Sequence, residues 1–121
     1  MESLWSAGPR DYASGTRQTP VVAIPAGKST VLLVATRAGW PHDMRHRGFS
    51  FQTEYSIDGG NSWLGGGGVT GDGKPVLDNF GNPMVATSVQ FDVPLPDRER
   101  LLRGTVSMDS TLKTALEVFV L

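Results

Sequence analysis

Apolar and polar residues alternate most clearly over residues 49–57, "FSFQTEYSI". Phe49, Phe51, Tyr55 and Ile57 fall on one face, and Ser50, Gln52, Glu54 and Ser56 fall on the other. A period of two is typical of an antiparallel strand with one face in the core and one in water. Asp58, Gly59 and Gly60 predict a turn after this strand, and Trp63 begins the returning strand.

Shorter apolar runs, rich in β-branched residues, predict five further strands. Two lie within residues 19–36 on either side of a turn at Pro25–Gly27, and the others cover residues 85–93, 101–109 and 114–121. The total is about seven strands with turn residues between them and almost no helix. This pattern predicts an all-β fold, a single antiparallel β-sandwich of Ig-like type, with an eight-stranded jelly roll as the alternative.

Residues 1–18 lack such a pattern. They are polar, with Leu4, Trp5 and Tyr12 as their large apolar side chains. They predict an extended N-terminal arm whose apolar side chains dock into a neighbouring protein, with the sandwich domain over residues 19–121. The alternative is that the arm folds back over its own sandwich.

The glycine-rich residues 64–83 predict a long loop. Asp72 and Asp78 within it could offer oxygen ligands to calcium, but the EF-hand spacing is absent, and aspartate is also a common turn residue. The sequence therefore predicts turn-forming roles for these residues and no bound cofactor or metal.

The chain of 121 residues is long enough for one domain with its own core, and it has no cysteine for disulfides or thiolate metal sites. Its net charge of −1 gives no reason to expect binding to nucleic acid or to an anionic membrane. The start of the sequence has no apolar stretch of signal-peptide length, and the longest apolar run, Val31–Ala35, is far too short to span a bilayer. These features predict a cytoplasmic protein, or one assembled in a cytoplasm.

The stretch "YSIDGGNSW", residues 55–63, has the spacing S-x-D-x-G-x-x-W and resembles the Asp-box of sialidases. The resemblance implies structural roles in a turn that begins at Ser56. The Asp58 carboxylate would accept backbone hydrogen bonds, Gly60 would take a positive φ, and Trp63 would pack over the hairpin and be largely buried. A propeller needs several repeated blades, whereas this motif occurs once in a short chain. We therefore interpret it as a hairpin stabiliser and expect no glycosidase activity.

A cationic loop, "RAGWPHDMRHRG", covers residues 37–48. Its two histidines are four residues apart, but the flanking Pro41 and Gly48 prevent the helix that a zinc H-x-x-x-H pair needs. Tryptophan beside arginine is typical of interface anchors, so Trp40, Arg45 and Arg47 are predicted to bind a partner. A solvated loop is the alternative.

The whole chain resembles the small β-sandwich structural proteins of tailed-phage virions. The resemblance rests on "IPAG" at residues 24–27, "SIDGGNSW" at 56–63 and "ALEVFVL" at 115–121. It implies a non-enzymatic head-decoration, neck or tail component that binds other virion proteins and itself in a homo-oligomer, and that is located in the virion. The predicted partner-binding residues are Leu4, Trp5, Tyr12, Trp40, Arg45 and Arg47.

Two alternatives belong to other functional classes. A carbohydrate-binding β-sandwich module would use Trp5, Trp40 or Trp63 as a stacking platform for sugar. A small hydrolase or lyase on a jelly roll is also conceivable, but no nucleophile–base pair can be identified in the sequence.

Overall fold

The structure is a computed structural model that describes residues 1–39, 48–70, 73–108 and 112–121. The described residues form strands and turns without a helix, and so contain no helix that could cross a membrane. The strands are β1 (Glu2–Tyr12), β2 (Gly15–Gln18), β3 (Val22–Ile24), β4 (Thr30–Ala38), β5 (Phe49–Ser56), β6 (Leu64–Thr70), β7 (Lys74–Leu77), β8 (Pro83–Asp92), β9 (Arg100–Met108) and β10 (Leu112–Val120).

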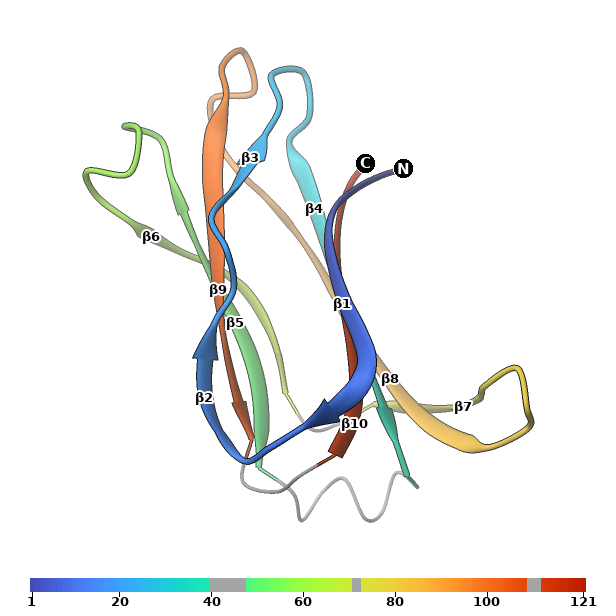
Figure 1. The fold of residues 1–121 in the computed structure, drawn as a ribbon. Helices are drawn as coiled ribbons and strands as arrows, with labels where there is room; N and C mark the ends of the chain where they lie inside the picture. Colours follow the sequence, from blue (N-terminus) through green and yellow to red (C-terminus); the bar gives the residue numbers. More distant parts are fainter. Residues whose placement is uncertain (40–47, 71–72, 109–111) are drawn as a thin grey trace.

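Two antiparallel sheets face each other (Figure 1). One has the strand order β1-β10-β4-β8-β7, and the other has the order β2-β9-β5-β6 with β3 also paired to β9. The prediction of an all-β antiparallel sandwich is therefore confirmed. The strands predicted over residues 49–57, 85–93, 101–109 and 114–121 correspond to β5, β8, β9 and β10.

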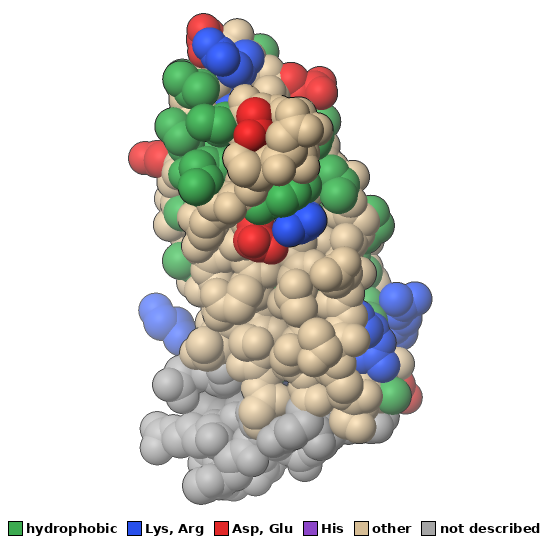
Figure 2. Space-filling view, turned by 90° about the vertical axis from the view of Figure 1, so that its left-hand side faces the viewer, with side chains coloured by type: hydrophobic (Ala, Val, Ile, Leu, Met, Phe, Trp, Pro, Cys, Tyr) green, Lys and Arg blue, Asp and Glu red, His purple; other side chains and the backbone are tan. Residues whose placement is uncertain are grey.

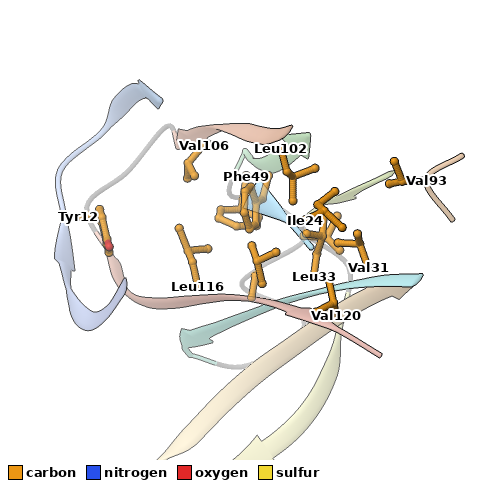
Figure 3. Packing of buried hydrophobic residues seen from close by; sticks show 14 of the residues in the cluster. Tyr12, Ile24, Val31, Leu33, Phe49, Val93, Leu102, Val106, Leu116 and Val120 are labelled. Atoms are coloured by element: carbon orange, nitrogen blue, oxygen red, sulfur yellow. The ribbon is translucent and has the colours of Figure 1, made fainter. Parts of the chain in front are cut away.

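The core lies between the inner faces of the two sheets (Figure 3). Alternate residues of β4 and β9 are buried along the whole length of each strand. Strands from both sheets supply fully buried side chains, among them Leu33 of β4, Phe51 of β5, Leu102 of β9 and Leu116 of β10. Tyr12 lies at the end of this cluster that is nearest Val106 and Leu116.

The prediction of a long loop over residues 64–83 is wrong, because this segment contains β6, β7 and the start of β8. The aromatic ring of Phe91 lies directly against the backbone of β6. A Cβ atom added to Gly67 would be 2.4 Å from a ring carbon of Phe91, and one added to Gly66 would be 3.0 Å away. Glycine therefore permits close packing between a strand and a ring here, which is a different role from making a loop flexible.

The predicted N-terminal arm is extended, but it is not separate from the sandwich. Its first part, β1, pairs with β10 from Glu2↔Val120 to Tyr12↔Leu112, and β2 pairs with β9. Residues 1–18 therefore add one edge strand to each sheet, and the alternative, an arm folded back over its own sandwich, is what the structure shows.

The side chains that the arm was predicted to offer to a partner pack inside the same chain. Tyr12 is 6% exposed, and Leu4 and Trp5 are half-buried against the core. The prediction that Tyr12 binds a partner is therefore the one that the structure corrects most strongly, because a side chain already packed in the core cannot dock into a neighbouring protein.

Candidate functional site

A groove of about 490 Å³ runs between the two edge strands β1 and β2. Trp5 and Tyr12 of β1 line it on one side and Arg17 of β2 on the other, and Val106 and Leu116 lie at its apolar floor. This volume is in the range of small-molecule sites, about 300–1,000 Å³. The groove is thus an opening between the two sheets.

An irregularity in β1 determines which side chains enter the groove. Ala7 pairs with Leu116, but the next pair is Arg10↔Thr114, so β1 has one more residue than β10 in this interval. Such a bulge shifts the alternation, and directly paired residues lie on the same face. Because Leu116 and Thr114 are buried, Arg10 shares the inner face with Ala7 even though the two are three positions apart.

Gly8 makes this bulge possible. Its φ of +84° is one that residues with a side chain avoid, and a Cβ atom at this position would lie 2.4 Å from the Thr114 carbonyl oxygen. A glycine is therefore required on both conformational and steric grounds.

Two arginines converge on one tyrosine ring in the groove. The guanidinium carbon of Arg10 lies 4.6 Å from the centroid of the Tyr12 ring, and that of Arg17 lies 5.8 Å from it. Arg17 also donates a 2.7 Å hydrogen bond to the carbonyl of Ala13. The electron-rich face of an aromatic ring attracts such cations, so Tyr12 holds both side chains at the groove.

Trp5 is half-buried, and its ring forms an edge-to-face pair with that of Phe51 at a centroid distance of 6.4 Å and an interplanar angle of 63°. Ser6, Gln18 and Thr19 add polar groups to the same groove. The groove therefore combines an aromatic surface with hydrogen-bonding groups.

The hairpin turn after β5 is held by hydrogen bonds of the Ser56 and Asp58 side chains, and the Ser62 hydroxyl contributes one of them. The Ser56 hydroxyl accepts a 2.9 Å hydrogen bond from the Gly60 N–H and donates one of 2.7 Å to Asp58. Asp58 also accepts hydrogen bonds from the Ser62 N–H at 2.9 Å and from the Ser62 hydroxyl at 2.5 Å. Gly60 has a φ of +95°. These contacts make Asp58 a turn-stabilising residue, while membership of the Asp-box class stays a prediction.

The same hydrogen bonds favour the ionised carboxylate. Those from the Ser62 hydroxyl, the Ser62 N–H and the Ser56 hydroxyl lower the pKa of Asp58 to about 2. Because the unfolded value is about 3.9, the ionised carboxylate stabilises the fold above about pH 4, and this contribution is lost as the pH falls through about 2.

We therefore expect the difference in melting temperature between the parent and Asp58→Asn to shrink as the pH is lowered from about 5 to about 2. Thermal melts across this interval measure it. Asp97→Asn is the matched control, since Asp97 is exposed and contacts the neighbouring Arg98 at 3.6 Å. A difference between parent and Asp58→Asn that does not change with pH would contradict this role for the carboxylate.

Trp63 is half-buried, less than the sequence predicted. The guanidinium of Arg103 lies 3.9 Å from the centroid of its ring, and Arg103 also contacts Glu54 at 3.2 Å. One face of this indole is therefore already covered. On the face of the molecule that Figure 2 shows, uncharged polar side chains and backbone cover the middle, and hydrophobic side chains gather toward one end.

The predicted partner-binding residues Trp40, Arg45 and Arg47 lie outside the described residues, and so do the loop histidines His42 and His46 and the aspartate Asp72. Arg37, at the start of the predicted cationic loop, is fully buried over the Phe49 ring at 4.2 Å, and burial lowers its pKa to about 10. Arg37 is therefore part of the interior and not of a solvated basic surface.

Asp78 stabilises a second turn. It accepts hydrogen bonds from the backbone N–H groups of Asn82 and Phe80, both at 2.8 Å, and these lower the pKa of its carboxyl. The described residues contain no cluster of three side chains that could hold a metal ion.

The sequence did not reveal the groove or its arginines. Trp5 and Ala7 are odd-numbered and Arg10 and Tyr12 are even-numbered, yet the bulge places all four on the same face of β1. A strict period of two therefore does not predict this face. The available signal is the Gly8-Pro9 pair between Ala7 and Arg10, since this dipeptide within an otherwise extended stretch is typical of a bulge.

No family model and no curated protein matches the chain. Among solved structures, the CBM27-1 module of Caldicellulosiruptor saccharolyticus, crystallised with mannohexaose, has a TM-score of 0.50 at 18% identity, covering 97% of this chain and 69% of that one. The K1 cleaved adhesin domain of Lys-gingipain from Porphyromonas gingivalis W83 has a TM-score of 0.44 at 14% identity, covering 87% and 59%. A family 16 carbohydrate-binding module has a TM-score of 0.37 at 9% identity, covering 92% and 72%. At 18% identity, the similarity to the CBM27-1 module shows a shared fold.

Proposed function

We propose that this protein is a carbohydrate-binding β-sandwich module whose ligand lies in the groove between β1 and β2. The observation that carries the proposal is the half-buried Trp5 beside polar groups in a groove of about 490 Å³. A sugar ring has apolar C–H faces that pack on an aromatic ring, and hydroxyl groups that need hydrogen-bonding partners. The groove offers both kinds of contact along one edge of the sandwich.

The chemistry of the groove favours binding over hydrolysis. Its lining contains no carboxylate and no imidazole among the described residues. Glycoside hydrolysis ordinarily requires two carboxyl groups at a defined separation, one of them a general acid. We therefore propose a non-enzymatic module.

One fold serves many functions, so the proposal rests on the groove and not on the shared fold. The interpretation as a virion component has no support from the comparisons and stays a prediction. Of the two, carbohydrate binding is the function that the volume and lining of the groove support.

Replacing Trp5 by leucine should weaken glycan binding at least tenfold, about 1.4 kcal/mol, because leucine fills part of the space but offers no flat ring. Affinity electrophoresis against a panel of soluble polysaccharides, followed by titration calorimetry with the best ligand, measures this effect. A melting curve of each variant shows that the sandwich remains folded.

Trp63→Leu is the matched control, since Arg103 already covers a face of that ring and Trp63 lies outside the groove. It should bind like the parent. If no polysaccharide binds the parent, the proposed function is wrong. If Trp63→Leu loses binding and Trp5→Leu retains it, the groove is not the binding site.

A further inference from the structure

We infer that the saccharide held in the β1/β2 groove is acidic, of the uronate class, and that its carboxylates are bound by Arg10 and Arg17. This inference rests on the proposed function, and it specifies the ligand of the same site.

The groove is locally cationic in a chain whose net charge is −1. Arg10 and Arg17 are its charged lining residues. Neither forms an ion pair with a carboxylate in the described part of the chain, where the ion pairs are Arg98–Asp97 and Arg103–Glu54. Asp11 lies next to Arg10 in β1, but it pairs with Lys113 in the β-ladder and does not line the groove. The two guanidinium groups are thus available to an anionic ligand.

Both cations are held in place before a ligand arrives. Each guanidinium lies over the Tyr12 ring, and Tyr12 itself is fixed because it is 6% exposed. A planar guanidinium presents a rigid set of N–H donors that matches a carboxylate in two parallel hydrogen bonds. Restricting the arginines beforehand lowers the entropic cost of forming those bonds.

The apolar floor of the groove strengthens the attraction between the two arginines and a carboxylate. Val106 and Leu116, at the floor, are 3% and 1% exposed, so one side of the groove is apolar. Charges interact more strongly beside such a surface than in open water. Trp5 remains the surface for the sugar ring, while the arginines account for its charge.

A uronate fits these features better than a nucleic acid does. Binding to nucleic acid usually depends on many phosphate contacts along a basic stripe, and the chain as a whole is slightly acidic. The groove has two arginines, an aromatic side chain and uncharged polar groups, which together match a short stretch of an acidic saccharide.

The test compares polygalacturonate with its methyl-esterified form, in which the sugar is the same and the charge is removed. Alginate is a second uronate, and mannan is an unrelated neutral glycan. We expect the parent to bind polygalacturonate or alginate at least tenfold more tightly than the methyl ester or mannan, because charge-assisted hydrogen bonds would be lost. Raising the salt from about 50 mM to about 500 mM should weaken uronate binding, because the charges are then screened.

The variants separate charge from folding. Arg10→Gln with Arg17→Gln should reduce uronate binding at least tenfold and leave any binding of the methyl ester nearly unchanged. Arg98→Gln removes an exposed arginine from the β8–β9 turn, outside the groove, and should bind like the parent. Tyr12→Phe keeps the ring beneath the arginines and should retain binding, whereas Tyr12→Leu should weaken it. Melting curves show whether each variant is folded.

The outcomes distinguish the inference from the proposed function. Equal affinity for the ester and the acid, or uronate binding that survives the double arginine substitution, overturns the inference and leaves carbohydrate binding in place. Absence of binding to every glycan overturns the proposed function. Binding of a single-stranded oligodeoxynucleotide in place of every glycan overturns both.

Discussion

Replacing Arg100 by methionine should lower the free energy of unfolding by about 3–5 kcal/mol, since the change removes the donors of several buried hydrogen bonds. Arg100 begins β9 and is 1% exposed, although it is charged. Its guanidinium donates to the carbonyl of Pro25 at 2.9 Å, to that of Lys28 and to that of Val93 at 3.3 Å. The side chain thus joins the β3–β4 turn to the start of the β8–β9 connection.

The size of the effect follows from what the substitution leaves behind. A methionine occupies much of the volume, but the carbonyl oxygens of Lys28 and Val93 lose the guanidinium as a donor, and a buried group left unsatisfied costs about 1–3 kcal/mol. The Pro25 carbonyl keeps its hydrogen bond from the Lys28 N–H. Domains of this size are typically stable by only about 5–15 kcal/mol. The variant should therefore be marginally folded at room temperature.

Urea denaturation of parent and variant measures the change. Arg98→Met is the control two residues away, because the Arg98 side chain is 55% exposed and forms an ion pair with the adjacent Asp97. It should alter stability by less than about 0.5 kcal/mol. Arg100→Lys keeps the charge with fewer donors and should fall between the two. If Arg100→Met unfolds at the same urea concentration as the parent, the side chain does not join the two connections.

Sequence patterns predicted the strands well where one face is buried. The alternation in residues 49–57 placed Phe49 and Phe51 in the core, as the structure has them. Ser56 was assigned to the polar face, yet it is 1% exposed. Its hydroxyl accepts a hydrogen bond from the Gly60 N–H in the turn that follows. This polar residue is therefore buried because the backbone of the turn needs a hydrogen-bond partner.

The failures have a common physical cause, which is contact with residues distant in sequence. The glycines of β6 suit a strand because the ring of Phe91 covers them, and no local pattern shows that ring. Residues 1–18 have too little apolar surface to fold alone, but β10 and β9 offer them open edges. Arg100 is buried because its partners lie more than seventy residues away as well as nearby. Composition and periodicity do not contain this information.

The sequence predicted part of the candidate site. Trp5 was identified as a sugar platform in the carbohydrate alternative, and it does line the groove. Tyr12 was assigned to a partner, whereas its ring holds two arginines inside the same chain. Arg10 and Arg17 carried no signal of their own, since solvated arginines are common. The bulge in β1 places Arg10 and Tyr12, and the pairing of β2 with β9 places Arg17 beside the same ring.

Gly8→Ala should both destabilise the protein, by about 2–4 kcal/mol, and abolish binding in the groove. An alanine at a φ of +84° is strained, and its Cβ atom would lie 2.4 Å from the carbonyl oxygen of Thr114. Thr114 belongs to β10, which is held between β1 and β4, so the strand has little freedom to move away. The bulge itself must then change, and Arg10 and Tyr12 leave the positions that form the groove.

Gly27→Ala separates the strain of the positive φ from the close contact with Thr114. Gly27 has nearly the same φ, +89°, but the position of its added Cβ atom has no neighbour within 4 Å. It carries the conformational strain alone, about 1–2 kcal/mol, and lies in the β3–β4 turn away from the groove. Urea denaturation should therefore show a larger loss for Gly8→Ala, and calorimetry with the best glycan should show binding for Gly27→Ala only. Equal losses of stability would mean that the close contact with Thr114 is relieved at no cost. Undiminished binding by Gly8→Ala would mean that the bulge does not position the side chains of the groove.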